Sequence, residues 1–299
     1  VIKVIDDNML TPFDIFQKPE DVRPYIDDNE KLILPICDNI VFALRNSLDP
    51  FEDSLVVYDR NQATVIGAFV KQYQLFQSFV RASRNCDMAA TIIFQRIIYE
   101  AYIKMRYLIK YGEGAQKEYR LCSYNNRYKF YQTYKEDSNP IARIAIEKFK
   151  ADINNEEFSI EEIEEAYVKK KRAFGGKNIS QLVEEFDQKE TYTSVYGYLS
   201  DSIHTDWGET RQLYLQETED ASFVYNPQKE IKISARQLVE QAQLMLESSF
   251  VLIEWLESVD KKYGIINIME SLLKELQRVL SLIIVNIFED YKTDKYLYE

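Results

Sequence analysis

Histidine is almost absent from this sequence: His204 is the only one among 299 residues. A di-iron helical bundle takes Glu-x-x-His units from two helices, and one histidine cannot supply both. For zinc, Asp201-x-x-His204 would supply only two ligands, fewer than a zinc site needs. We therefore expect no metal site and no cofactor. Any histidine-based acid–base chemistry would have to depend on His204 alone.

Cysteine is scarce as well. The three cysteines, Cys37, Cys86 and Cys122, are an odd number, lie far apart and include no CxxC pair. Neither a disulfide framework nor a cysteine-based zinc site is predicted from such a set. A reducing compartment suits it, so we expect the protein to be cytoplasmic.

Glycine and proline are few, at 8 and 7 residues, and long apolar runs are missing. The densest apolar run, Val279–Phe288, has about half the length that spans a bilayer. The opening residues, VIKVIDDNML, have too short an apolar stretch for a signal peptide and quickly become acidic. We expect an ordered, helix-rich chain that makes no contact with membrane.

Positive charge is in deficit, since the chain carries a formal net charge of −12. This balance argues against broad binding to nucleic-acid phosphates or to anionic lipid. One basic run remains, Lys169–Arg172, followed by Lys177. It is not a phosphate-binding Walker loop, because Lys171 stands where the first glycine is needed and Asn178 replaces the Ser or Thr. The run is interpreted as a solvated helix end, with an RNA or phosphate contact as the alternative.

Hydrophobic spacing predicts an all-α fold: a single multi-helix, bundle-like domain with a small β-hairpin near residues 213–233. Helix ends are indicated by a capping box over Ser159–Glu162, by Gly112 and Gly114, and by Ser234. Helices are expected over residues 29–47, 59–83, 87–111, 115–137, 140–152, 159–175, 179–187, 191–207, 234–263 and 265–291.

Domain boundaries are predicted from the same pattern. Residues 1–30 are acidic and punctuated by proline, which favours an irregular arm with one short helical turn. Residues 31–291 contain neither a repeat of 20–50 residues nor a linker, so we expect one helical domain. Residues 292–299 are expected to fray as a tail.

The candidate site residues come from two predicted helices far apart in the sequence. Arg96 and Glu100 lie one turn apart in the most apolar part of the segment 87–111, and Ser200 and His204 are likewise spaced in the segment 191–207. Tyr196 lies one turn before Ser200, on the same face. We hypothesise that these faces meet, with His204 and Arg96 as candidate catalytic residues and Glu100, Tyr196 and Ser200 as binding residues.

Two plainer interpretations stay open for these residues. Arg96 and Glu100 can form a structural salt bridge, because a charge held away from water must be paired. His204 can be a structural hydrogen-bonding residue. A serine-hydrolase site is not favoured, since no glycine-rich turn around Ser200 would supply oxyanion donors.

These residues resemble a family known as domain of unknown function 5677, found chiefly in bacteria. The resemblance covers roughly residues 60–260, and membership implies no activity. The motifs that carry it are RIIYE at 96–100, the pair Tyr107-Leu108, YRLCSYNNRYKFY at 119–131 and YGYLSDSIH at 196–204.

A wider similarity is to helical prokaryotic domains of the HEPN class, many of which are metal-independent ribonucleases in toxin–antitoxin and phage-defence systems. Their signature is an Arg followed, after four to six residues, by a His on one helix. Here the Arg positions hold Gly197, Tyr198 and Leu199, so Arg96 would have to substitute from the neighbouring helix. The resemblance thus implies a nuclease only with a rearranged site.

Two functions follow as expectations. The first is a binding module, in bacterial defence or stress response, that acts through protein partners; a homodimer is one form of such association. The alternative is a HEPN-like ribonuclease in which His204 is the acid–base group and Arg96 stabilises phosphate charge.

Overall fold

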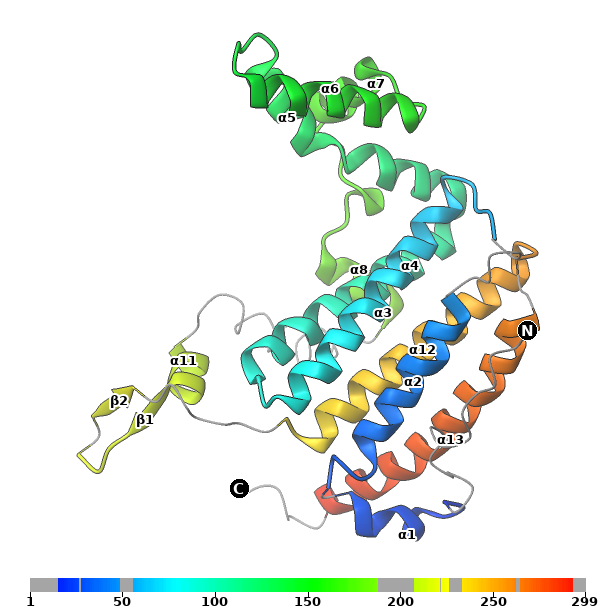
Figure 1. The fold of residues 1–299 in the computed structure, drawn as a ribbon, viewed down its shortest axis with the longest axis vertical. Coiled ribbons are helices and arrows are strands. Elements are labelled where there is room, and N and C mark those ends of the chain that lie inside the picture. The colour runs from blue at the N-terminus through cyan, green and yellow to red at the C-terminus, as the bar shows by residue number, and fades with distance from the viewer. Residues whose placement is uncertain are drawn as a thin grey trace. The chain divides into compact units, whose positions relative to one another are not determined.

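The computed structural model describes residues 16–26, 28–48, 56–187, 207–220, 222–225, 233–261 and 264–292. Within these ranges the chain is built from helices, and its only strands form one antiparallel pair (Figure 1). The predicted all-α fold with a small β-hairpin is confirmed. No helix in this described part is both long and apolar enough to cross a lipid bilayer.

Most of the predicted helices are present, with ends within a few residues of those expected. The short arm helix appears as α1 and η2. In chain order the elements are α1 (Pro19–Val22), η2 (Arg23–Tyr25), α2 (Ile33–Leu48), α3 (Gln62–Arg84), α4 (Met88–Cys122), α5 (Asn125–Tyr134), α6 (Pro140–Asn155), α7 (Ile160–Val168), η3 (Phe174–Gly176), α8 (Ile179–Phe186), α11 (Trp207–Tyr214), β1 (Leu215–Glu217), β2 (Phe223–Tyr225), α12 (Ala235–Ser258) and α13 (Gly264–Lys292).

Contacts divide the chain into two compact units. Unit 1 consists of Val1–Val56, Phe69–Tyr102 and Thr193–Glu299, and unit 2 of Val57–Ala68 and Ile103–Tyr192. Helices α3 and α4 contribute residues to both. The interpretation of residues 31–291 as one helical domain, between an arm and a tail, stays a prediction.

The core of unit 1 lies where α2, α12 and α13 pack against one another, side by side in Figure 1. Helix α12 buries a stripe that includes Leu238, Ala242 and Met245, spaced by three and four residues. That spacing keeps the stripe on one face because an α-helix turns once every 3.6 residues. The helix begins with a capping box in which Ser234 Oγ accepts a hydrogen bond from the Gln237 amide, as the sequence predicts.

A buried polar contact joins α3 to α12 inside unit 1. Ser248 Oγ donates to Gln72 Oε1, and both residues are fully buried, while Gln72 Nε2 has no hydrogen-bond partner in the part of the chain that the structure describes. A buried polar group left unpaired costs about 1–3 kcal/mol. The contact therefore favours one rotation of the two helices and lowers stability at the same time.

Within unit 2, helix α4 is interrupted at Gly112. Its φ of 62° and ψ of −149° are open to glycine and strained for other residues. The interruption lies where the sequence predicts the helix end, but helical residues resume and continue to Cys122. Gln116 Nε2 bonds the Leu108 carbonyl at 3.0 Å and so spans the interruption.

The predicted helix over 115–137 is wrong as a single element. The chain turns at Ser123 and Tyr124, between α4 and α5, and Ser123 Oγ donates to the Arg120 carbonyl at 2.6 Å. The turn allows Tyr124 and Tyr128 to be buried in one aromatic cluster. Side-chain packing therefore overrides the helical propensity of the segment.

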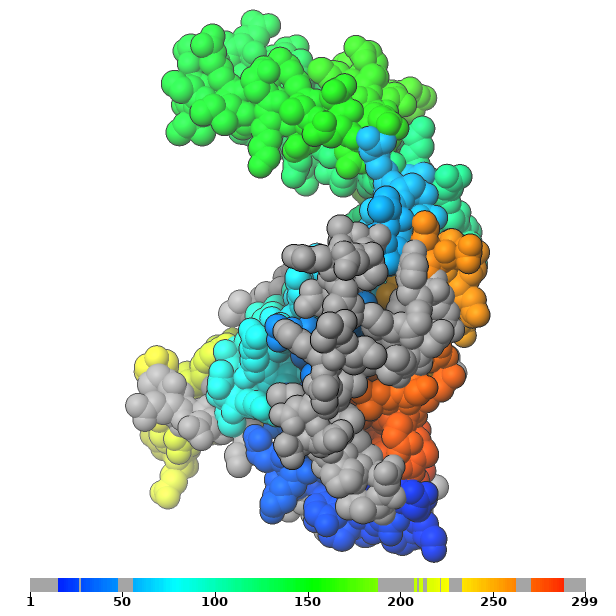
Figure 2. Space-filling model, turned by 45° about the vertical axis from the view of Figure 1, so that its right-hand side comes forward, coloured from blue at the N-terminus to red at the C-terminus, as the bar shows by residue number. Residues whose placement is uncertain are grey.

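Helices α5, α6 and α7 enclose that cluster, and Figure 2 shows their residues (green) as a continuous packed body. Asn139 caps α6 by accepting from the Ile141 amide, with Pro140 in the first turn. Ser159 and Glu162 form the predicted capping box of α7. The buried members of the cluster are Tyr124, Tyr128, Phe149, Ile153, Phe158 and Ile163.

Helix α7 ends at Val168, earlier than the predicted end at Gly175 and Gly176. Lys170 takes a left-handed φ of 51°, and the Lys171 amide donates back to the Ala166 carbonyl at 2.8 Å, which closes the helix. Residues 169–178 then form a loop that contains η3. The glycines that were interpreted as the helix end belong to this loop.

The β-hairpin follows α11 in unit 1. Leu215 pairs with Tyr225, Gln216 with Val224 and Glu217 with Phe223. The predicted helix over 191–207 lies outside the described residues except for Trp207, where α11 begins. Residues 293–299, most of the predicted tail, also lie outside them.

Candidate functional site

Arg96 and Glu100 lie on successive turns of α4, in the part of the helix that belongs to unit 1. Both are half-buried, and both interact with neighbouring groups of the protein. Of the apolar residues whose spacing predicts this helix, Ile98 is fully buried, but Ile93 is 40% exposed. The pair thus lies at the edge of the core, where a salt bridge and a binding role are both physically reasonable.

The other three predicted site residues, Tyr196, Ser200 and His204, lie outside the described residues. The hypothesis that they meet Arg96 and Glu100 stays a prediction. The assignment of His204 as a catalytic residue rests on the sequence alone.

Metal ligands and reactive thiols are not gathered into a site in the described part of the chain. No group of three or more His, Cys, Asp or Glu side chains there could hold a metal ion. All three cysteines are free, and burial raises the pKa of the Cys37 thiol to about 12. A thiol with so high a pKa carries almost no thiolate at neutral pH and is a poor nucleophile.

A basic cluster in unit 2 surrounds Glu185 of α8. Lys110 Nζ donates to one carboxylate oxygen at 2.6 Å, Tyr111 donates its hydroxyl to the same oxygen, and Lys177 Nζ donates to the other. The two ammonium groups also lie over aromatic rings, with Lys177 Nζ 5.7 Å from the Tyr107 ring centre. Two cations and one anion leave this cluster with a positive charge.

The Glu185 carboxylate is held ionised by its neighbours. Burial would raise its pKa, since its side chain is only 15% exposed, but hydrogen bonds from Lys110, Lys177 and Tyr111 outweigh that effect and lower the pKa to about 2. The hydrogen bonds to Glu185 also raise the pKa of both lysines. The cluster is therefore fully charged at neutral pH and fastens α8 to α4.

This pKa predicts a pH-dependent part of the stability. In the unfolded chain Glu185 takes up a proton below its ordinary pKa of 4.5, whereas in the folded protein it stays ionised until about pH 2. The free energy of unfolding therefore falls as the pH drops from 4.5 to about 2. We expect Glu185→Gln to remove about 2 kcal/mol of that loss, measured by urea unfolding at about pH 6 and about pH 3. The control is Glu184→Gln, a change of the exposed residue next to Glu185, which should leave the pH-dependent loss as it is in the wild type. An equal loss in wild type and Glu185→Gln would contradict the prediction.

The predicted basic run belongs to the same unit and precedes Lys177 of this cluster by a few residues in the chain. Lys169–Arg172 is exposed at the end of α7, and Lys169 pairs with Glu165. Residues 103–122 and 169–187 together hold ten Lys or Arg and five Asp or Glu, in a chain whose net charge is −12. This part of the chain is therefore positive where the remainder is strongly negative.

The loop after the run is not shaped as a phosphate cradle. The Gly175 amide donates to Glu118 Oε1 at 3.0 Å, the Gly176 amide to the Arg172 carbonyl, and the Lys177 amide to the Phe174 carbonyl. Backbone N–H groups that bind phosphate must point at the ligand instead. Any anion here would have to be bound by the lysine and arginine side chains.

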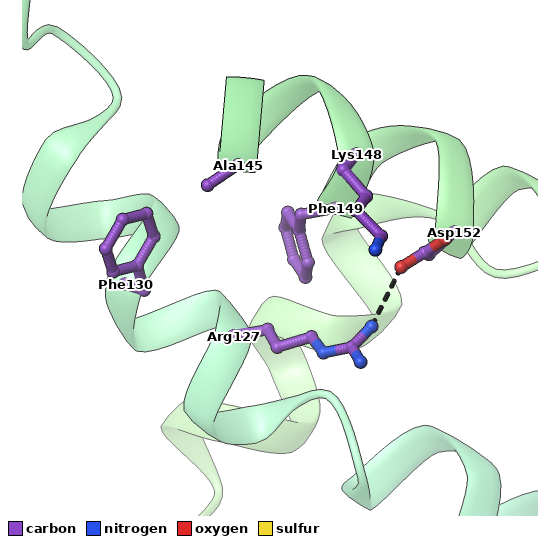
Figure 3. A pocket seen from close by; sticks show the side chains of 6 residues that line it. All are labelled: Arg127, Phe130, Ala145, Lys148, Phe149 and Asp152. Atoms are coloured by element: carbon purple, nitrogen blue, oxygen red, sulfur yellow. Dashed lines mark hydrogen bonds and ion pairs between the residues drawn. The ribbon is translucent and has the colours of Figure 1, made fainter. Parts of the chain in front are cut away.

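A groove between α5 and α6 is a further candidate site, and the sequence interpretation missed it (Figure 3). It has a volume of about 330 Å³. Phe130 of α5 lies across from Phe149 of α6, with Ala145 above and between them in the view of Figure 3. Arg127, Lys148 and Asp152 complete the lining at the other end.

The groove has a rigid floor. Phe149 is buried and packs its ring against Tyr124 and Tyr131, at 6.3 and 5.5 Å between ring centres. Arg127 Nη1 binds Asp152 Oδ2 at 2.8 Å and its guanidinium lies over the Tyr124 ring at 5.5 Å. These contacts hold the lining in place before any ligand arrives.

Helix α6 carries exposed isoleucines one turn before Ala145 and Lys148, two of the residues that line the groove. Ile141 and Ile144 of α6 are 77% and 70% exposed, and Phe130 of α5 is 41% exposed. Helix α6 already buries the stripe Ala142, Ile146, Phe149 and Ile153, so these isoleucines form a second stripe that the fold does not use. The spacing of Ile141, Ile144 and Ala145 was the available sequence signal, but it reads as part of one broad apolar face.

A family model matches residues 62–222, more than half of the chain, and is described as a family of unknown function, DUF5677. The chain belongs to the DUF5677 family. The predicted family resemblance is thereby confirmed, although the matched region ends at residue 222 rather than near 260. Neither a curated protein nor a solved structure is similar enough to this chain to add a relative.

The DUF5677 match covers all the candidate sites. It includes the predicted site residues Arg96, Glu100, Tyr196, Ser200 and His204, the Glu185 cluster, and the α5–α6 groove. Helices α12 and α13, which complete the core of unit 1, lie beyond it. The family description assigns no activity, so function has to be argued from the sites.

Proposed function

We propose that this DUF5677 protein is an interaction module that binds a protein partner through α5 and α6. The observation that carries the proposal is the second apolar stripe of α6, with Ile141 and Ile144 mostly exposed beside a groove with a rigid aromatic floor. Scattered exposed apolar residues are normal, but large aliphatic side chains grouped at a concave site are typical of a binding surface.

The exposed apolar side chains would supply the free energy of binding when a partner removes them from water. Ile141 and Ile144, which remain mostly exposed in the free chain, would each contribute up to about 1.5–3 kcal/mol if a partner buried them fully, and Phe130, already more than half buried, would contribute less. Such anchors next to a preformed pocket are where binding energy concentrates in known interfaces. We place this activity in the bacterial cytoplasm, as the resemblance to DUF5677 and the cysteine usage imply, and in defence or stress response, as the wider HEPN similarity implies.

The proposal is tested with a random 16-residue peptide library displayed on phage and panned on the purified protein. We expect enriched peptides whose binding is lost in Ile144→Glu, because a carboxylate would be forced into the apolar contact. Asn154→Glu is the matched control, since Asn154 is exposed on the same helix, does not line the groove and lies nine residues after Ala145, on the opposite side of the helix. Enriched peptides that bind both variants equally, or no enrichment at all, would overturn the proposal.

A second copy of the chain could occupy the same stripe. Sedimentation of wild type and Ile144→Glu separates this form of the proposal from binding to another protein. A homodimer that dissociates in Ile144→Glu would make the partner a copy of this chain.

The second candidate function is RNA cleavage. The observation that favours it is the positive charge of residues 103–122 and 169–187, which would attract phosphate to this part of an otherwise acidic chain. In this proposal His204 transfers protons and Arg96 stabilises the charge that develops on the phosphate. Glu100, Tyr196 and Ser200 would bind the substrate.

Mixed RNA incubated with the purified protein tests this candidate. We expect cleavage that is lost in His204→Ala and reduced in Arg96→Gln, with circular dichroism to confirm that both variants fold. Cleavage that persists in His204→Ala would point to a contaminating nuclease and contradict the assignment.

A further inference from the structure

The two ends of the α5–α6 groove differ in chemistry. Phe130 and Ala145 make one end apolar, while Arg127, Lys148 and Asp152 make the other charged (Figure 3). Asp152 is already paired with Arg127, and Lys148 is exposed and forms no ion pair with any residue that the structure describes. One positive charge therefore remains unbalanced at the charged end.

The unbalanced charge and the apolar stripe share one side of α6. Three residues of α6 follow Ile141 at helical spacing: Ile144, Ala145 and Lys148 come three, four and seven residues after it. This spacing places all four in a row on one side of the helix. Asp152 continues the row by one more turn. A ligand that follows this row meets aliphatic carbon first and an ammonium group one turn later.

We propose that the groove binds an amphipathic helix of a partner protein, with a large apolar residue on the Ile144 side and an Asp or Glu about one turn away facing Lys148. This inference rests on the proposed interaction function and names the chemistry of the partner. A helix suits the site because a groove between two helices accepts residues spaced at i, i+3, i+4 and i+7 from a third. An acidic residue suits it because a carboxylate would balance Lys148 and accept its hydrogen bonds.

The residues that line the α5–α6 groove would have different roles in binding the partner helix. Phe149 and Ala145 form the apolar surface that contacts the partner's apolar residue, and the ring contacts of Phe149 keep that surface in place. Lys148 is too exposed to add much affinity, so its role is to select among partners by charge. Arg127, held by Asp152 and lying over the Tyr124 ring, closes the charged end of the groove.

A basic partner is disfavoured by the same arrangement. The carboxylate that could attract it, Asp152, is occupied by Arg127, and a second ammonium group beside Lys148 would be repelled. A neutral apolar helix would fill the groove but leave Lys148 without a counter-charge. The charge preference is therefore the part of the inference that an experiment can isolate.

The test uses peptides selected from the phage library on the full chain. We expect the selected helices to carry Asp or Glu near an apolar anchor, and a synthetic peptide of this kind to bind Lys148→Glu about 5- to 10-fold more weakly in fluorescence anisotropy. The same peptide with its acid changed to Lys should prefer Lys148→Glu to wild type. Lys129→Glu, an equal charge change on an α5 residue that does not line the groove, should leave both affinities unchanged.

The outcomes separate the two levels of the proposal. Peptides that need Ile144 but show no acidic preference, with affinities indifferent to Lys148→Glu, would overturn the inference about the partner and leave the interaction function standing. The absence of any peptide that depends on Ile144 would overturn both.

Discussion

Phe149→Ala is expected to lower the free energy of unfolding of unit 2 by about 3–5 kcal/mol. Its ring is buried in the aromatic cluster and contacts Tyr124 and Tyr131, so truncation removes apolar contacts and leaves a cavity below the groove. Because Trp207 and Trp255, the only tryptophans, both lie in unit 1, tryptophan fluorescence would follow the wrong unit. Amide hydrogen exchange along α6 measures the loss directly.

Phe130→Ala is the matched control for this prediction. Phe130 lines the same groove from α5 but is 41% exposed. Among the described residues, Tyr134 is the only aromatic ring that it contacts. We expect a loss of about 1 kcal/mol or less. If the two alanine variants exchanged equally fast, Phe149 would not be the packed floor described above.

Arg120→Met is expected to destabilise unit 2 by about 2–3 kcal/mol. The Arg120 side chain is 12% exposed and donates to Glu156 Oε2 at 2.6 Å, to the Glu156 carbonyl at 2.7 Å and to Asn61 Oδ1 at 2.8 Å. Its guanidinium also lies 5.0 Å from the Phe158 ring centre. Methionine fills similar space but leaves a half-buried carboxylate and an amide oxygen without their donor.

Two further variants identify the cause of that loss. Arg127→Met breaks an exposed ion pair with Asp152 and should change stability by less than about 1 kcal/mol. Arg120→Lys keeps the charge but not the planar fork, so it should recover only part of the loss. Full recovery in Arg120→Lys would mean that charge alone, rather than the three directed hydrogen bonds, stabilises this position.

The sequence was a good guide to the helices. Periodic apolar residues predicted α3 and α13 almost to their ends and the start of α12, although α12 ends at Ser258 rather than near Tyr263. The capping boxes at Ser159 and Ser234 are both formed. These signals are local, because a cap or a helical stripe is defined within a few residues of chain. The conformation of Gly112 was likewise indicated by residue type.

The errors occur where distant contacts decide the local structure. The break at Ser123 depends on burial of Tyr124 and Tyr128 against α6 and α7, and α7 stops at Val168 although the sequence continues without a proline. Phe174 takes a left-handed φ of 63° because its ring packs against Tyr107 and Tyr119. No property of the isolated segments indicates these outcomes.

The candidate sites divide in the same way. Placing Arg96 and Glu100 on one helix requires only their spacing, and this part of the prediction agrees with α4. The α5–α6 groove depends on which of two apolar stripes on α6 is buried, and that choice follows from tertiary packing. The meeting of Arg96 with His204 stays a prediction that rests on the sequence pattern.

The exposed stripe of α6 has a consequence for the handling of the protein at high concentration. Aliphatic side chains that face water on every copy attract one another, and the repulsion between copies with a net charge of −12 opposes that attraction. Near the isoelectric point, about pH 4.9, or in concentrated salt, the repulsion vanishes while the attraction remains. Colloidal stability therefore depends on buffers well above that pH, and a bound partner that covered Ile141 and Ile144 would make the protein less sensitive to both conditions.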